Sequence, residues 1–437
     1  MLNKPIIKLS SEFDETLTQL EKSTETIFVT GRAGTGKSTL LQTFRNSTQK
    51  NVVVLAPTGV SALNVQGQTV HSFFGFPPRY IPKTDIKPRR SKALYQKLDT
   101  VIIDEISMVR ADMLDNIDFF LRMNGKQPEK PFGGVQMIFF GDLFQLPPIV
   151  ASPEEQHIFQ TEYKSPYFFS AHVFKHIYLQ TIELHTIYRQ TDRHFIRLLD
   201  EVRSAAVDED TLNALNERFC DTKKGVNVDE DIAYITLSAR NATADEMNKR
   251  KLEAIHEPIL TYIGKIEGEF NDKLCPAEQA LQLKVGAQVM FVRNDNKDKQ
   301  YVNGTIGTVE KLTNESIEVL VVSEKGLPSM VTVEKSTWET LKYDLDEKGE
   351  LKGKPTGSFT QYPLRLAWAV TIHKSQGKTF DRVRIDLSGG GAFEHGQTYV
   401  ALSRCRTLEG ITLAQKLKPK DIIVDTRIVE FHEFSKR

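Results

Sequence analysis

The stretch TIFVTGRAGTGKSTLLQTF, residues 26–44, places a glycine-rich turn between an apolar run typical of a buried strand and a run typical of a helix. Residues 31–38 fit the pattern GxxxxGK[ST], whose glycines let backbone N–H groups and the helix N-terminus face phosphate oxygens. In such a loop Lys37 neutralises the β- and γ-phosphates, and Ser38 can ligate Mg²⁺. The stretch therefore predicts a nucleoside triphosphate site made by Gly31, Gly34, Thr35, Gly36, Lys37, Ser38 and Thr39.

Further apolar runs alternate with helical patterns on both sides of this loop. NVVVLAP (51–57), TVIIDE (100–105) and VQMIFFGD (135–142) predict a parallel sheet with helices on both faces. A second α/β series begins near IYLQTIEL (177–184) and resumes at AYITLS, VRIDL and TYVALSRCR. We therefore expect an α/β fold with a first domain at 1–178, including a small insertion at about 64–92, and a second at 179–300 and 363–437. Short alternating runs predict an inserted antiparallel β-module at 301–362.

Composition limits the classes of protein that are possible. The 437 residues hold 57 Lys plus Arg and 57 Asp plus Glu, so attraction to nucleic acid would have to come from local patches. The cysteines, Cys220, Cys275 and Cys405, lie far apart and form no CxxC pair. The N-terminus lacks an apolar signal core, and no apolar stretch approaches the roughly 20 residues that span a bilayer. We expect a cytoplasmic protein without a membrane partner.

An acidic pair follows the run VII at 101–103. Because ligands of an α/β sheet bind beyond the carboxyl ends of its strands, Asp104 would meet the Mg²⁺ held by Ser38. Glu105 would then orient or deprotonate the attacking water. An acidic pair alone is more often a solvated strand end, but downstream of a phosphate loop the catalytic interpretation is favoured.

Hydrolysis also needs positive charge near the departing γ-phosphate. Apart from Arg32, the phosphate loop offers no arginine at the right place, so the charge must come from elsewhere. Arg189 in HTIYRQ and Arg404 in ALSRCR are candidates to reach across a cleft from the second domain. Most arginines are surface charges, so that interpretation would be favoured for either arginine considered alone.

The order of these segments resembles a known group of proteins. GRAGTGKST, APTGVSALN, TVHSFF, VIIDEISMV, GDLFQLPP, YRQ, TIHKSQG and YVALSRCR are similar to the ordered motifs of superfamily-one helicases with two RecA-like domains. The segment DMLDNIDFFLRMNGKQPEKPFGG resembles the signature of the PIF (petite integration frequency) helicases, which RecD-like relatives lack. The resemblance implies an ATP-dependent, Mg²⁺-dependent DNA helicase that tracks 5′-to-3′ on single strands. It also implies an Src-homology-three-like barrel for the inserted module, and it adds Gln376 and Gly377 to the nucleotide-binding residues.

Two segments are interpreted through this resemblance. In GDLFQLPP (141–148), Pro147 and Pro148 end the strand. Gln145 would sense the γ-phosphate or its attacking water, whereas Asp142 could cap a turn or act in catalysis. The family commonly reads adenine with the glutamine of an LSxEQ segment, but this chain has LSSEF with Phe13 there. Phe13 could stack on the base, Gln19 could substitute, or Phe13 could be an ordinary core residue.

Polar and aromatic residues near the predicted strand ends suit a single-strand groove, in which hydroxyls and amides hold phosphates and aromatics stack on bases. The expected partners are single-stranded DNA and duplex junctions, with G-quadruplex DNA a further possibility, and the expected state is a monomer. An ATP-switched remodelling protein and an RNA helicase remain alternatives. The candidate DNA contacts are Thr58, Gly59, His71, Ser72, Phe73, Ser238, Arg240, Asn241, Arg293, Asn303, Gly304, His373, Lys374 and Ser375.

Overall fold

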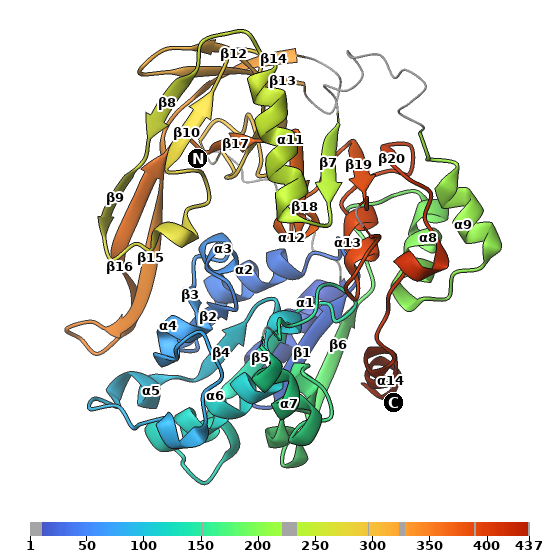
Figure 1. Ribbon diagram of the computed structural model, residues 1–437. Helices are drawn as coiled ribbons and strands as arrows, with labels where there is room; N and C mark the ends of the chain where they lie inside the picture. The colour runs from blue at the N-terminus through green and yellow to red at the C-terminus, as the bar shows by residue number, and fades with distance from the viewer. Residues whose placement is uncertain are drawn as a thin grey trace.

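The computed structural model describes residues 11–150, 152–220, 234–295, 297–322, 328–388 and 390–435. Residues 1–10, which include the first part of the LSSEF segment, lie outside the described residues. Figure 1 shows a blue-to-teal first domain in the lower part of the view, with a green and red second domain above it on the right and a yellow-to-orange β-module above it on the left. In the described part of the chain, no helix is long and apolar enough to cross a membrane.

The first sheet is parallel, as the alternating pattern predicts. Within the described residues its strand order is β3-β2-β4-β5-β1-β6, and each neighbouring pair is parallel. The inner strands β1, β4 and β5 are completely buried, which explains their continuous apolar sequences. The strands are β1 (Thr26–Gly31), β2 (Val52–Ala56), β3 (Gln68–Thr69), β4 (Thr100–Ile103), β5 (Gln136–Phe140) and β6 (Leu179–Leu184).

Strand β6 corrects the expected domain boundary. We expected residues 179–184 to open the second domain, but β6 pairs along its whole length with β1 of the first sheet. The apolar run was recognised correctly, but a strand's partner depends on contacts that are distant in sequence. The first sheet therefore extends to Leu184.

Helices cover both faces of the first sheet. Helix α2 (Lys37–Ser47) begins directly after the phosphate loop and buries Leu40, Leu41 and Phe44. Helix α6 (Ala111–Asn124) carries the first part of the family-signature segment and is buried along most of its length. The other helices of this domain are α1 (Ser11–Lys22), α3 (Gly59–Asn64), α4 (Val70–Phe74), α5 (Ala93–Lys97) and α7 (Pro153–Thr161).

The second sheet is also parallel, with the order β18-β7-β19-β20 in the described residues. Helix α14 leaves this domain and lies against the first one (Figure 1). There the ring of Phe431 stacks on that of Phe169, with 4.3 Å between the ring centroids. The strands are β7 (Ile235–Ser238), β18 (Ala369–Thr371), β19 (Val383–Asp386) and β20 (Ile411–Leu413), and the helices are α8 (Arg193–Ser204), α9 (Glu209–Asn216), α11 (Asn241–Glu253), α12 (Ile372–Ser375), α13 (Gln397–Ser403) and α14 (Thr426–Ser435).

The inserted β-module is antiparallel, but it is larger than the predicted range 301–362. Two strands that precede that range pair with strands inside it, β11 with β12 and β9 with β16, and β17, which follows the range, pairs with β11 at the edge of the sheet β14-β13-β12-β11-β17. A separate buried cluster around Val289, Val319 and Leu364 holds the larger sheet together. The strands are β8 (Leu260–Ile263), β9 (Lys265–Gly268), β10 (Ala280–Leu283), β11 (Gln288–Phe291), β12 (Ile306–Leu312), β13 (Ile317–Val322), β14 (Pro328–Val333), β15 (Ser336–Leu345), β16 (Leu351–Gln361) and β17 (Leu364–Leu366).

The module contacts the first domain through its long hairpin β15-β16. The hydroxyl of Tyr343 accepts a hydrogen bond from Val54 N at 3.0 Å, and Tyr343 N donates to Gln68 Oε1 at 3.2 Å. These groups are buried, so the contact excludes water. The module is therefore docked on the first sheet in this conformation.

Candidate nucleotide site between the sheets

The phosphate loop has the backbone that its glycines allow. Gly34 and Gly36 have φ values of +86° and +83°, which side chains other than glycine rarely adopt. A Cβ atom on Gly34 would also lie 2.5 Å from Arg189 Cβ, so this position has no room for a side chain. Lys37 Nζ donates to Gly31 O at 2.7 Å and to Arg32 O at 3.0 Å, which holds the ammonium over the loop.

A cavity of about 400 Å³ brings most of the predicted site residues together. Gly31, Asp104 and Gln376 do not line it, although Asp104 and Gln376 adjoin lining residues. Sequence reasoning missed Ala33, Tyr188, Thr379 and Arg406, which also line the cavity. The predicted residues that line it are Gly34, Thr35, Gly36, Lys37, Ser38, Thr39, Glu105, Gln145, Arg189, Gly377 and Arg404.

The acidic pair lies at the carboxyl end of β4, as expected. Burial and the neighbouring Glu105 raise the pKa of Asp104 to about 7. Burial also raises the pKa of Glu105, although Lys37 and Arg404 oppose the shift. Glu105 has a left-handed φ of +52°, a strained value for a residue other than glycine and one often found at functional sites. Its Oε2 accepts a hydrogen bond from Gln376 Nε2 at 3.0 Å.

Ser38 and Asp104 are suitable ligands for Mg²⁺. Mg²⁺ is usually held by one or two carboxylates together with substrate phosphates and water. Ser38 lines the cavity, and Asp104 adjoins it with a carboxyl group that burial makes costly to ionise without a cation. Within the described residues, no group of three or more His, Cys, Asp or Glu side chains forms a protein-only metal cage.

Two arginines meet at the far side of the cavity. Arg404 is 1% exposed and donates from Nε to Val400 O at 2.9 Å. Arg189 Nη1 donates to Ser403 O at 3.1 Å, and burial together with Arg404 lowers the pKa of Arg189 to about 9. Arg404 lies at the end of α13 in the second domain, as predicted. Arg189 instead follows β6 of the first sheet, so its expected place within the second domain is corrected.

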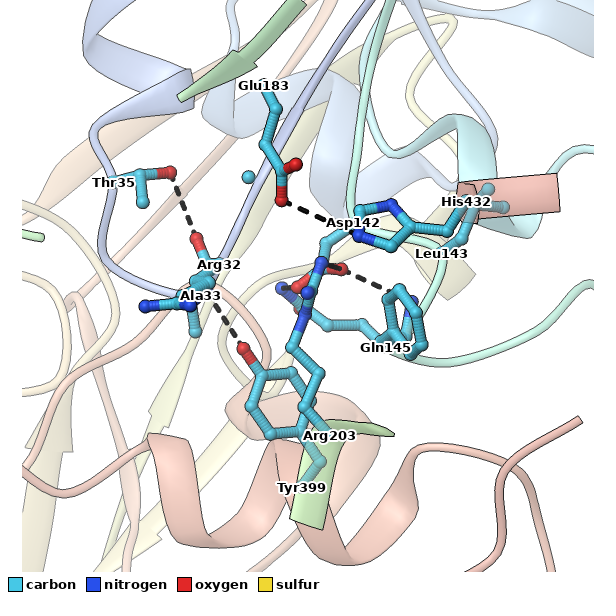
Figure 2. A network of polar contacts seen from close by, with 12 residues as sticks. Arg32, Ala33, Thr35, Asp142, Leu143, Gln145, Glu183, Arg203, Tyr399 and His432 are labelled. Atoms are coloured by element: carbon cyan, nitrogen blue, oxygen red, sulfur yellow. Dashed lines mark hydrogen bonds and ion pairs between the residues drawn. The ribbon is translucent and has the colours of Figure 1, made fainter. Parts of the chain in front are cut away.

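Gln145 and Asp142 form one hydrogen-bonded unit after β5. Asp142 Oδ1 accepts from Phe144 N at 3.2 Å, which is the predicted turn role, and Oδ2 accepts from Gln145 Nε2 at 3.2 Å. Asp142 also pairs with Arg203 Nη2 at 3.1 Å (Figure 2), and no motif in the sequence pointed to this contact. Burial opposes ionisation of Asp142, but Arg203 and Lys37 outweigh it and lower the pKa of this carboxyl group.

Phe13 is a core residue, which was one of the alternatives that the sequence left open. Its side chain is 3% exposed, and its ring meets the ring of Tyr188 edge-on at 6.3 Å. A Cβ atom on Gly36 would lie 3.1 Å from Phe13 Cζ, so the ring lies directly behind the phosphate loop. Gln19 lines a separate surface hollow with Gln180 rather than the nucleotide cavity. The alternative in which Gln19 reads the adenine therefore finds no support in the residues that line the cavity.

The candidate DNA residues divide by exposure. Phe73, Ser238 and Ser375 are buried, and Phe73 packs on Phe74 and Tyr95. The hydroxyl of Ser238 accepts a hydrogen bond from Arg240 N, and that of Ser375 donates to Ile372 O. The expectation that these three side chains contact DNA is corrected for this conformation, because burial leaves them out of reach of a strand.

Several other candidates have defined local roles. Thr58 and Ser72 accept hydrogen bonds at the starts of α3 and α4, from Ser61 N at 3.2 Å and from Gln68 Nε2 at 2.8 Å. Gly59 lies against Leu274 of the module, because a Cβ atom on it would fall 2.1 Å from Leu274 Cδ2. Asn303 N and Gly304 N donate to Asn294 Oδ1 and Phe291 O in the module. His71 is partly buried, and burial together with Arg110 lowers its pKa.

The remaining candidates lie on the surface of the second domain and module. Arg240 lies over the ring of Phe393 at 5.2 Å, and Arg293 over that of Trp338 at 5.7 Å. His373 Nε2 lies 3.0 Å from Glu394 Oε2. Asn241 and Lys374 are exposed.

A phosphate loop that faces Arg404 across a cavity between two parallel sheets defines a phosphate-loop protein of the RecA-like class. A family model described as PIF1-like helicase matches residues 9–213, and one described as the 2B domain of DNA helicase Pif1 matches residues 271–312. The chain belongs to the PIF1-like helicase family.

Individual relatives agree with this assignment over almost the whole chain. The ATP-dependent DNA helicase Pif1 of Bdellovibrio bacteriovorus is 35% identical over 98% of this chain and 92% of its own length. Pif1 from a Bacteroides species in complex with ADP-AlF4 is 38% identical, covers 98% of this chain and 97% of its own, and has a TM-score of 0.89. Bacteroides Pif1 bound to single-stranded DNA is also 38% identical, with 98% and 96% coverage, and has a TM-score of 0.67.

Proposed function

We propose that this protein is an ATP-dependent DNA helicase that translocates 5′-to-3′ on single-stranded DNA and separates duplex or structured DNA. The observation that carries the proposal is the cavity in which the phosphate loop of one sheet faces Arg404 of the other. The Bdellovibrio relative is an ATP-dependent DNA helicase, and the direction of travel follows from the family resemblance.

The residues around the cavity have distinct roles in ATP hydrolysis. Lys37 and the loop N–H groups bind the β- and γ-phosphates, and Arg404 and Arg189 stabilise the charge of the departing phosphoryl group. Glu105 orients and deprotonates the attacking water, for which its raised pKa suits it. Ser38 and Asp104 would hold Mg²⁺, which supplies charge neutralisation at the phosphate oxygens when bound.

The cavity lies between the domains, so nucleotide binding favours their closure and hydrolysis releases them. Arg240, Asn241, Lys374 and His373 of the second domain would hold the strand together with Thr58 and Ser72 of the first. Because Gly59 lies against Leu274, a strand that reaches α3 requires the module to move away. The lower TM-score with the DNA-bound Bacteroides structure supports such a rearrangement.

Finer properties are part of the same proposal. The protein binds single strands and duplex junctions, acts as a monomer in association with the nucleoid, and unfolds G-quadruplex DNA. Native mass spectrometry with and without a tailed duplex tests the monomer, because a two-to-one complex on one tail would contradict it.

A strand-displacement assay tests the function directly. Duplexes with a 5′ tail, with a 3′ tail or with blunt ends are compared under ATP, and a matched duplex whose tailed strand is RNA serves as the control for substrate class. We expect displacement from the 5′-tailed DNA alone. ATP hydrolysis without displacement would instead indicate a remodelling ATPase, and preference for the RNA track would indicate an RNA helicase.

A further inference from the structure

A buried ion pair connects the loop of Gln145 to a helix of the second domain. Arg203 lies near the end of α8, which packs against α13, and its Nη2 lies 3.1 Å from Asp142 Oδ1. The side chains are 8% and 0% exposed, so water competes little for either charge. In Figure 2 the side chain of Arg203 lies beside Tyr399 and extends to Asp142.

The environment of Arg203 favours a fixed position. An arginine does not release its proton in a protein, so once buried it needs a counter-charge. Asp142 supplies the charge, and the guanidinium carbon lies 4.1 Å above the ring of Phe144, the residue next to Gln145. Arg203 therefore contacts the Gln145 loop through both a carboxylate and an aromatic face.

Asp142 in turn decides which way the amide of Gln145 points. An ionised carboxylate only accepts hydrogen bonds, so the Nε2 group of Gln145 must face Asp142 Oδ2, 3.2 Å away. Gln145 Oε1 then points to the opposite side, where Gln376 Nε2 approaches it at 3.5 Å and also donates to Glu105. The oxygen is thus presented toward the carboxylate proposed to activate water.

We propose that Arg203 is a positioning residue for ATP hydrolysis: through Asp142 it holds the Gln145 amide with its oxygen toward the catalytic water when the domains are closed. The inference rests on the proposed role of Gln145. Because Arg203 belongs to the second domain and Asp142 to the first, the arrangement is complete only while α8 lies against the Gln145 loop. Arg203 thereby makes the position of the amide depend on domain closure.

The test compares turnover and nucleotide affinity in Arg203→Met, Gln145→Ala and the double variant. We expect Arg203→Met to lower the kcat of DNA-stimulated ATP hydrolysis by about a hundredfold, the effect of a misplaced reacting group, while the Kd for a non-hydrolysable ATP analogue changes less than about twofold. Arg203→Lys keeps the charge but loses the planar fork, and we expect it to restore part of the rate. Arg197→Met is the matched control, since Arg197 lies on the same helix, is 64% exposed and pairs only loosely with Glu201 at 3.8 Å.

Coupling between the two sites decides the outcome. If Arg203 acts through Gln145, the double variant is no slower than Gln145→Ala alone. If the losses in kcat of the two single variants multiply in the double variant, or if Arg203→Met loses kcat and nucleotide affinity equally, the ion pair is purely structural and the inference is overturned. If Arg203→Met does not fold, the same comparison is made with Arg203→Lys. A Gln145→Ala variant with normal turnover would contradict the proposed site itself, whereas a slow Gln145→Ala beside a normal Arg203→Met contradicts only this inference.

Discussion

Removing one hydroxyl group tests whether contacts between the domains control turnover. Tyr399 on α13 accepts a hydrogen bond from Ala33 N of the phosphate loop at 3.0 Å (Figure 2). Tyr399 and Ala33 are 3% and 7% exposed, so Tyr399→Phe leaves a buried N–H group without an acceptor. An unpaired buried group of this kind costs about 1–3 kcal/mol.

The cost falls on the closed arrangement of the domains, because only there do Ala33 and Tyr399 meet. A coupling free energy of about 1–3 kcal/mol corresponds to a roughly 5- to 150-fold change in the ratio of closed to open molecules. Since Arg404 lies on the same helix region as Tyr399, opening also withdraws an arginine from the cavity. We therefore expect a lower kcat at saturating single-stranded DNA, with nucleotide binding to the phosphate loop largely retained.

The assay measures kcat with saturating DNA and, separately, the Kd of a fluorescent ATP analogue. Tyr362→Phe is the matched control, because its hydroxyl donates to Glu315 O at 2.6 Å inside the β-module, away from the cavity. This control should lose stability without losing turnover. Equal kcat values for Tyr399→Phe and wild type would refute the role of this contact in closure.

Three further changes have expected outcomes. In the native protein the pKa of Asp104 is raised to about 7, so the nucleotide-free native state binds more protons than the unfolded chain between about pH 4 and 7. The protein therefore loses stability as pH rises from about 4 to 7. Asp104→Asn should flatten this part of the profile of Tm against pH, and identical profiles for variant and wild type would argue against the raised pKa. Arg404→Ala should lower kcat by about 10³-fold with a much smaller change in ATP affinity, and matched losses would indicate ground-state binding. Tyr343→Phe removes the hydroxyl that accepts a hydrogen bond from Val54 N, which weakens docking of the module on the first domain by about 1–3 kcal/mol. If the docked module competes with DNA, this variant should bind single-stranded DNA more tightly, and weaker binding would contradict that competition.

The sequence predicted the parts of this molecule that depend on local chemistry. The loop at residues 31–38 requires glycines, a lysine and flanking strand and helix patterns, all of which are visible in one continuous stretch. The carboxyl ends of parallel strands meet at one edge, which is why Glu105 and Gln145 could be placed in one cavity before the sheet order was known. Arg404 was singled out because hydrolysis needs positive charge near the departing phosphate and its segment ALSRCR belongs to the predicted second domain.

Other features depend on partners that lie far away in the chain. Strand β6 has the same apolar pattern whether it joins the first sheet or the second, so only its pairing with β1 decides. The predicted range of the module, 301–362, was too short because β11 and β17 become part of the module only through strand pairing. Arg203 resembles any helical arginine, and only the position of Asp142, 61 residues away, distinguishes it.

The most direct measurement compares wild type and Lys37→Ala for DNA-stimulated ATP hydrolysis and single-strand binding in the same preparation. Lys37 lies on the phosphate loop, where its Nζ donates to Gly31 O. The buried core behind this loop is made by other residues, among them Phe13 and Leu40. If hydrolysis in this cavity drives the protein along DNA, Lys37→Ala abolishes hydrolysis and strand displacement while Tm and much of the single-strand binding remain. Wild-type turnover in Lys37→Ala would contradict this account.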